Sequence, residues 1–246
     1  MIILFFDYTI EDFPNLKKSS YVYFPFYIQT FLTNGRNWGR FRHLTWKLTH
    51  SVMWDNIFAF LGFEKGWDTR KETNYIFEAK KELKQIFTPT DSIVTKAHIL
   101  FDKMHEQADI IIGMHIRRGD YVKWNGGVFY YELSDYYEIM CRIKKLYSNH
   151  KVAFFISTNE ILNLTFFNGC LCFSHPIDES AILDLYSLSL CDRIVGPVST
   201  FSRWASFIGE KPLCFLYSKD QMIKEDSFST IIDFFHFADG HEIKDW

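Results

Sequence analysis

The feature that most constrains the fold of this chain is the alternation of apolar and amphipathic segments in its second half. Five apolar runs have the length of buried strands: 109–116, 151–158, 169–174, 193–197 and 211–217. Three segments between them have the apolar spacing of helices: 133–147, 178–191 and 199–209. Strands that alternate with helices at this spacing predict a parallel sheet covered on both faces. Ligands of such sheets bind beyond the carboxyl ends of the strands, so residues that follow a strand are candidates for a site.

The first hundred residues do not show this alternation. Four segments there are aromatic or amphipathic and are interpreted as mostly helical: 19–32, 46–63, 77–87 and 88–104. We therefore expect an α/β protein in two parts. A reduced, mostly helical N-terminal portion is predicted for 1–105, and a Rossmann-like domain with a C-terminal tail for 106–246.

Composition and charge exclude several classes of protein. The 246 residues carry 27 basic and 30 acidic side chains, a formal net charge of −3, so no strong field favours nucleic acid as a partner. No apolar run reaches the roughly eighteen residues of a membrane-spanning helix. The first residues also lack the basic region of a signal peptide. We therefore expect a cytoplasmic protein with no integral membrane segment, and peripheral association with the inner face of the membrane stays open.

The five cysteines do not indicate a metal or disulfide site. Their number is odd, and Cys170 and Cys172 are the one closely spaced pair. A zinc site or a disulfide framework would need better-spaced ligands or partners, so buried free thiols are expected.

The segment "HIRRGD" follows directly on the first apolar run. Alternation along a strand places His115 and Arg117 on one face, and Arg118 with Asp120 on the other if the extended geometry continues. The planar guanidinium of Arg117 would then suit phosphate oxygens, while Asp120 holds Arg118. The alternative is a purely structural ion pair between Arg118 and Asp120, with His115 hydrogen-bonded at the edge of a domain.

Two later groups of polar residues also follow or face strand ends. Asp184 interrupts an otherwise apolar helix, and its carboxylate either accepts from paired N–H donors of a base or is simply exposed. Ser199, Thr200 and Ser202 open a helix directly after a strand. Hydroxyls and free amides at a helix N-terminus form a cradle for anions, and the alternative is an ordinary N-cap by Ser199 or Thr200.

Three motifs in order carry a resemblance to a known family. They are "GMHIRRGDYV" at 113–122, "FFISTNE" at 154–160 and "DLYSLSLCDRIVGPVSTFSRWASFIGEKP" at 184–212. Together they resemble the fucosyltransferases that share a His-x-Arg-Arg-x-Asp motif, a superfamily of α-1,2-, α-1,6- and protein O-fucosyltransferases. The first motif is most similar to that of the bacterial α-1,2-fucosyltransferases, glycosyltransferase family 11. The resemblance covers residues 75–217.

The resemblance implies a GT-B-like fold whose C-terminal Rossmann-like domain binds GDP-fucose. It implies an inverting transfer of fucose to a glycan hydroxyl, of the α-1,2 type, without a metal or other cofactor. Arg117 would bind the β-phosphate of GDP, His115 would lie near the nucleotide, and Asp184 would accept the hydrogens on guanine N1 and N2. The other positions implied in catalysis or donor binding are Asp120, Ser199, Thr200 and Ser202.

The sequence departs from the family pattern on its N-terminal side. No Gly-x-Gly-Asn-type loop follows "MIILFF", so a shortened N-terminal domain is expected and the acceptor glycan stays unassigned. Two alternatives to fucosyl transfer therefore remain open. One is a non-catalytic relative that only binds a nucleotide sugar, and the other is a transferase that uses a different nucleotide sugar.

The segment after the first motif is rich in aromatic and acidic residues. Trp124, Tyr130 and Tyr131 either line a sugar pocket or pack as a loop over the sheet. Asp120, together with Glu132 and Asp135, is a candidate base for activating an acceptor hydroxyl, and geometry has to decide among the three.

Overall fold

The computed structural model describes residues 3–4, 12–15, 22–23, 80–176, 179–232 and 236–243. The chain divides into two compact units, Met1–Thr88 and Pro89–Trp246. This boundary lies earlier than the one predicted near residue 105. Helix α6 (Asp91–His105) belongs to the second unit, because its buried Phe101 and Met104 pack into the core beside the sheet.

The described part of the first unit is small. Strands β1 (Ile3–Leu4) and β2 (Val22–Tyr23) pair in parallel, so this piece of a segment interpreted as helical is a strand. A β-branched and an aromatic residue both suit a strand, which explains the difference. Helix α5 (Lys80–Ile86) ends beside Phe87, whose ring meets that of Phe13 edge to face at 5.5 Å. The rest of the predicted helical segments before residue 77 lies outside the described residues.

The second unit is built on a five-stranded sheet, as predicted. Its strands are β3 (Ile110–Ile116), β4 (Val152–Thr158), β5 (Leu171–Phe173), β6 (Arg193–Pro197) and β7 (Leu213–Leu216). They lie in the order β5-β4-β3-β6-β7, and every neighbouring pair is parallel. This order places β3 in the middle of the sheet. The expectation of a Rossmann-like parallel sheet is confirmed.

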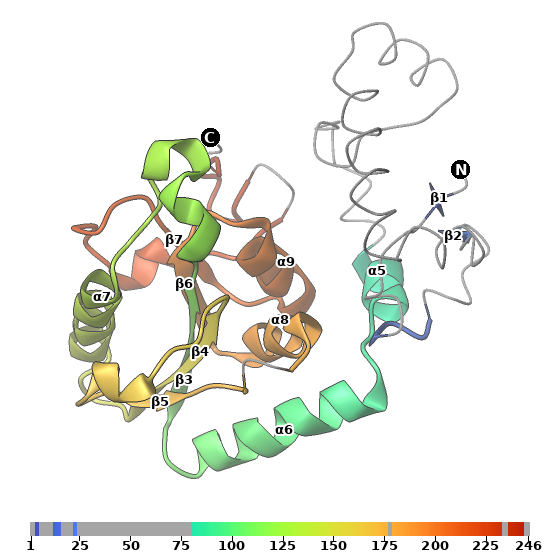
Figure 1. The fold of residues 1–246 in the computed structure, drawn as a ribbon, viewed down its shortest axis with the longest axis horizontal. Helices are drawn as coiled ribbons and strands as arrows, with labels where there is room; N and C mark the ends of the chain where they lie inside the picture. Colours follow the sequence, from blue (N-terminus) through green and yellow to red (C-terminus); the bar gives the residue numbers. More distant parts are fainter. Residues whose placement is uncertain are drawn as a thin grey trace, which may run out of the picture. The chain divides into compact units, whose positions relative to one another are not determined.

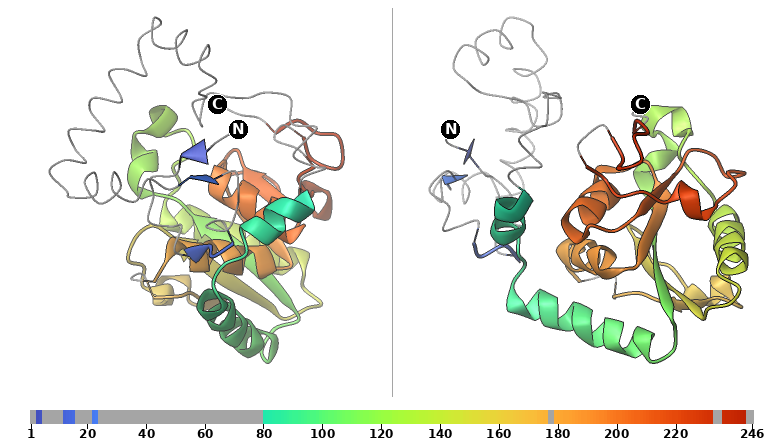
Figure 2. Two further views of the ribbon diagram at one scale, coloured as in Figure 1. Left: turned by 90° about the vertical axis from the view of Figure 1, so that its right-hand side faces the viewer. Right: turned by 180° about the vertical axis from the view of Figure 1, so that it is seen from behind.

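Helices cover both faces of the sheet, which explains why its strands are apolar throughout. Helix α7 (Leu133–Leu146) lies on one face, and α8 (Ala181–Leu190) and α9 (Thr200–Gly209) lie on the other (Figures 1 and 2). Alternate residues of β3 serve the two layers. Ile112 and Met114 pack with residues of α7, whereas Ile111 packs with residues of α8 and α9.

The helices begin at polar residues that satisfy their first amides. Ser180 caps α8 and Ser199 caps α9, each accepting from the backbone N–H two residues on. Helix α7 begins in a different way. Glu132 is the cap, in a reciprocal capping box with Asp135. In the part of the chain that the structure describes, no helix combines the length and the apolar character needed to cross a membrane.

The strand order creates a switch point beside the central strand. From β3 the chain adds β4 and β5 on one side and then returns to place β6 and β7 on the other. Ligands of open α/β sheets bind in the crevice at such a reversal. The two strands come very close here, because a Cβ added to Gly196 of β6 would lie 2.8 Å from both Cβ and the carbonyl oxygen of His115. Glycine at 196 therefore lets β6 pass beside His115.

Candidate functional site

A cavity of about 480 Å³ opens at the carboxyl ends of the strands, where the sequence places the site. Its walls come from five parts of the second unit. The end of β3, the end of β4 and the segment after it, the loop after β5, and the first turns of α8 and α9 all contribute. The polar lining residues are His115, Arg117, Ser157, Thr158, Asn159, Glu160, Ser174, His175, Glu179, Ser180 and Asp184.

His115 is buried at the base of this cavity. Its side chain is 3% exposed, and its ring lies 5.2 Å from the ring of Phe201 at the start of α9. Nδ1 has no hydrogen-bond partner among the described residues. Burial, helped by the charge of Arg117, lowers the pKa of His115 to about 3, so the imidazole is neutral at physiological pH. A neutral, unpartnered nitrogen in a cavity wall is available to a ligand.

Arg117 lines the cavity, and its partner differs from the prediction. Nε and Nη2 each lie 3.0 Å from an oxygen of Asp120, so Asp120 holds Arg117 instead of Arg118. The reason is that the strand ends at Ile116 and the chain turns into a 3-10 helix, Gly119–Val122. Asp120 then lies three residues along a turn from Arg117, and strand alternation no longer applies.

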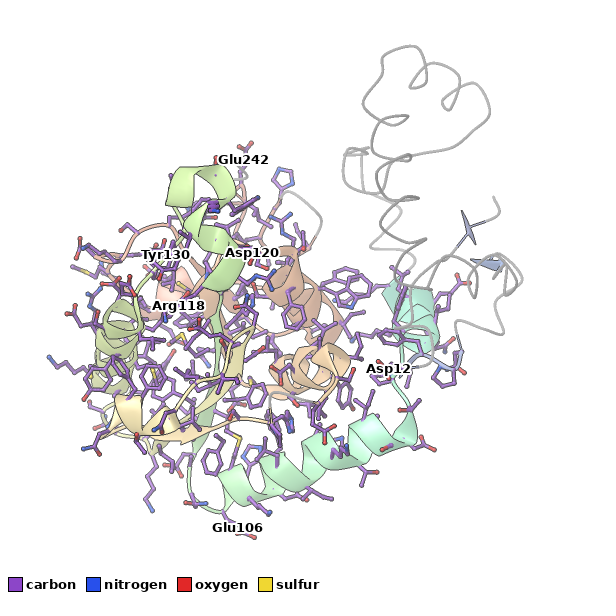
Figure 3. The ribbon with its side chains drawn as sticks, viewed as in Figure 1. Asp12, Glu106, Arg118, Asp120, Tyr130 and Glu242 are labelled. Atoms are coloured by element: carbon purple, nitrogen blue, oxygen red, sulfur yellow. The ribbon has the colours of Figure 1, made fainter. Side chains whose placement is uncertain are left out.

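Arg118 faces a different set of partners, on the loop that leads to α7 and on the segment after β4. Its Nη1 donates to Glu160 at 2.8 Å, and its Nη2 donates to Tyr130 Oη at 2.8 Å and to Glu132 at 2.9 Å. Figure 3 shows Arg118, Asp120 and Tyr130 together at the end of the sheet opposite Glu106. The expected Arg118–Asp120 pair is therefore wrong, and Arg118 ties the segment after β3 to the segment after β4.

Asp184 lies on the first turn of α8 and lines the cavity. Its carboxylate accepts hydrogen bonds from the Ser157 hydroxyl and the Thr158 backbone N–H. Burial nevertheless raises the pKa of Asp184 to about 6, because these two bonds only partly offset the loss of water. The alternative that Asp184 is simply exposed is wrong.

The start of α9 is a capped helix end beside the cavity. Ser199 is buried, and its hydroxyl accepts from Phe201 N at 3.2 Å. Ser202 is fully buried and donates to the Ser199 carbonyl at 3.3 Å, while Thr200 is half-buried. Of this turn, Phe201 is the residue that lines the cavity. A role of Ser199, Thr200 and Ser202 in holding phosphate stays a prediction, and the N-cap interpretation of Ser199 is confirmed.

Several cavity residues were not singled out from the sequence. Ser157 follows Phe155 on the β4 face that packs toward α8, and it pairs in register with His115. Alternation along 151–158 would have placed it there, beside a strand end. His175 lies after the short strand β5, where no periodicity marks it, and its Nε2 is 2.8 Å from the Ser187 hydroxyl. Burial lowers the pKa of His175.

The aromatic segment after the motif packs as a loop over the sheet. Trp124 stacks against Tyr121 at 4.6 Å and Phe129 at 5.8 Å. Tyr131 is 3% exposed and donates to the Leu216 carbonyl, and Tyr130 accepts from Arg118. None of these side chains lines the cavity described above.

The three candidate bases have structural partners of their own. Asp135 belongs to the capping box of α7, Glu132 accepts from Arg118, and Asp120 is paired with Arg117. Across the described residues, no cluster of three or more histidine, cysteine or acidic side chains is placed to hold a metal ion. Arg117 is a cationic side chain in the cavity lining that could meet an anionic ligand.

The doubly wound sheet, with a polar cavity at its switch point, defines the second unit as a Rossmann-like α/β domain. A model of glycosyl transferase family 11 matches residues 54–228. The match covers more than half of the chain, and the chain belongs to this family.

Individual relatives are distant. Galactoside alpha-(1,2)-fucosyltransferase 1 of Oryctolagus cuniculus is 22% identical, over 65% of this chain and 44% of that enzyme. The chain thus spans less than half the length of this curated relative. Among solved structures, fucosyltransferase NodZ from Bradyrhizobium matches with a TM-score of 0.40 and 23% identity, over 52% of this chain and 46% of its own. POFUT1 in complex with GDP matches with a TM-score of 0.43 and 12% identity, over 56% and 50%.

Proposed function

We propose that this chain binds GDP-fucose in the cavity at the switch point and transfers fucose from it to a glycan hydroxyl. Membership of glycosyl transferase family 11 supports the reaction class. The single observation that carries the proposal is the convergence of Asp184, Arg117 and the unpartnered nitrogen of His115 on one cavity. These groups supply an anionic acceptor for a base edge, a cation for phosphate and a neutral hydrogen-bonding group between them.

The same groups suit the chemistry of a nucleoside diphosphate leaving group. In an inverting transfer, the acceptor hydroxyl gives its proton to a base, for which Asp120 is a candidate, and its oxygen attacks C1 of fucose while the bond from C1 to the β-phosphate oxygen breaks. Negative charge then grows on the β-phosphate, and a fixed guanidinium beside it stabilises the transition state more than the ground state. Arg117 is suited to this role because Asp120 holds Nε and Nη2, while Nη1 has no partner among the described residues. An α-1,2 linkage and the inverting course belong to this proposal.

We also propose that the transfer is independent of metal ions. The sequence has no Asp-x-Asp pair, and the guanidinium together with the amides at the start of α9 would supply the positive field. Activity should survive an excess of EDTA. Loss of activity in EDTA that manganese restores would contradict this part of the proposal.

The proposal is tested by calorimetry with GDP, UDP and ADP, followed by an assay of fucosyl transfer and of GDP-fucose hydrolysis. GDP should bind more tightly than the other two nucleotides, since Asp184 accepts from donors that uracil and adenine do not present in the same way. Equal affinities would remove the guanine assignment. The alternative, a relative that only binds the nucleotide sugar, predicts GDP-fucose binding without transfer or hydrolysis.

A further inference from the structure

A buried hydroxyl stands behind the carboxylate of the candidate site. Ser157 is 2% exposed and is the second-to-last residue of β4, and its register partner on the central strand is His115. It lies on the face of β4 that packs against α8, the helix that carries Asp184. Serine is an uncommon choice at such a position, because a buried hydroxyl is costly without a hydrogen-bond partner.

The partner of this hydroxyl is Asp184. Ser157, Thr158 and Asp184 line the same cavity, and hydrogen bonding from the Ser157 hydroxyl and the Thr158 backbone N–H favours the ionised carboxylate, so two consecutive residues of one strand end hold it. A carboxylate offers about four lone-pair positions. Two are occupied from the sheet side, which leaves the others for donors that arrive from the cavity.

We propose that Ser157 is a positioning residue that fixes the Asp184 carboxylate so that it accepts two adjacent N–H donors of a purine base. This inference rests on the function proposed above and deepens it. A guanine presents two such donors side by side, its N1–H and its 2-amino group, whereas hypoxanthine has the same ring and only N1–H. Without the Ser157 hydroxyl the carboxylate is free to rotate, and the preference for two donors over one is lost.

The electrostatic surroundings of Asp184 support a pH-dependent readout. The charged and titratable groups that share the cavity with it are His115 and Arg117 from β3 and its end, Glu160 after β4, His175 after β5 and Glu179 before α8. His115 is neutral because its pKa is about 3, and the pKa of His175 is lowered as well. With the pKa of Asp184 at about 6, base recognition should weaken as the pH falls through that value. Loss of the Ser157 donor should move this midpoint upward, since it removes a bond to the ionised form.

The test compares the affinities of GDP and IDP for the full chain and four variants by calorimetry, from pH 5 to 8. The wild-type protein should prefer GDP by about tenfold or more, the worth of one hydrogen bond to a charged acceptor. Ser157→Ala should reduce this preference to about twofold or less and raise the pH midpoint. Ser157→Cys, which keeps the side-chain volume and donates only weakly, should behave similarly. Ser189→Ala is the matched control, because Ser189 is a buried serine of α8 that donates to the Tyr186 carbonyl and does not line the cavity, so both readouts should stay unchanged.

The outcomes separate this inference from the proposed function. If wild-type protein and the Ser189 variant do not bind GDP, the proposed function fails. If Asp184→Asn loses GDP while Ser157→Ala and Ser157→Cys keep the wild-type preference and midpoint, the role of Ser157 is overturned and the function stands. If Ser157→Ala does not fold, the cysteine variant decides the question, with its melting temperature as the check on folding.

Discussion

Two neighbouring regions at the carboxyl edge of the sheet handle buried charge in opposite ways. Around Arg118, opposite charges meet, since two carboxylates and a tyrosine hydroxyl accept from the two Nη atoms of one guanidinium. In the cavity, Asp184 is held only by neutral donors, and its pKa is raised to about 6. The first arrangement stabilises the fold. The second keeps a poorly compensated carboxylate in a cavity wall, which is useful only if a ligand completes its environment.

The largest effect that would sharpen this contrast is expected from Asp184→Asn. The amide presents N–H where an acceptor is needed, so GDP affinity should fall by about 100-fold or more. UDP affinity should change little, which makes UDP the internal control in the same calorimetric series. A variant that binds GDP as well as the wild-type protein would remove Asp184 from the base site.

The same variant should be more stable than the wild-type protein near neutral pH. The pKa of Asp184 is about 6 in the folded state against an ordinary value of 3.8, so burial favours the protonated form. Stability that depends on this group is therefore present below about pH 4, falls as the pH rises to about 6, and stays low above it. At pH 7.5, Asn should gain about 1–3 kcal/mol in the free energy of unfolding, since one pH unit corresponds to about 1.4 kcal/mol. Denaturant unfolding of both proteins at pH 4 and at pH 7.5 measures this gain. If the variant and the wild-type protein differ by the same free energy of unfolding at both pH values, this explanation is contradicted.

Arg118→Lys should show the opposite behaviour. Lysine keeps the charge but cannot reach Glu160, Tyr130 and Glu132 together, so unfolding should become easier by about 1–3 kcal/mol. GDP affinity should stay within about threefold of wild type, which corresponds to roughly 0.7 kcal/mol in binding free energy. Thermal melting and GDP titration on one preparation check both parts. Normal stability with weakened GDP binding would show that Arg118 is the phosphate ligand.

Arg117→Lys should lower GDP affinity by about tenfold and leave the melting temperature nearly unchanged. Lysine is a point charge that loses the planar fork suited to phosphate oxygens. The Arg117–Asp120 pair is too exposed for its loss to affect folding much, with side-chain exposures of 35% and 57%. An early melting transition with normal GDP affinity would invert the roles of the two arginines.

The smallest stability effect should come from Asp120→Asn, with a change below about 0.5 kcal/mol in the free energy of unfolding. An Arg118–Asp120 pair predicts a loss as large as that of Arg118→Lys, so thermal melting of these two variants distinguishes the two pairings directly. If Asp120 also takes part in the chemistry, transfer should fall while GDP affinity remains.

The sequence predicts the sheet well and the turns poorly, for a physical reason. All five strands and α7, α8 and α9 lie where apolar periodicity places them, because burial on both faces of a parallel sheet leaves a strong pattern. The predicted ion pair between Arg118 and Asp120 is wrong because the strand ends at Ile116, one residue before Arg117. The geometry of the following 3-10 turn depends on Gly119, whose φ is +25°, and on contacts with distant residues.

The candidate site could be predicted in part. His115, Arg117 and Asp184 all line one cavity, as their positions at strand ends and on a helix start suggested. Ser157 and His175 were missed because a single hydroxyl in an apolar strand and a histidine in a loop carry no periodic signal. Their placement depends on which strands become neighbours. That information is tertiary, and it became visible only with the order β5-β4-β3-β6-β7.

The strand order has a consequence for the time at which the site exists. Strand β6 lies beside β3 in the sheet, although α7, β4, β5 and α8 come between them in the chain. The cavity wall around His115 needs Phe201, which follows β6. Long-range pairings of this kind form late because a long loop must close first. Until the second half of the sheet has returned to the centre, a growing or refolding chain has the arginine motif but no cavity around it. Ligand binding therefore reports the completion of the domain, and a ligand that binds only the finished sheet also protects it from opening.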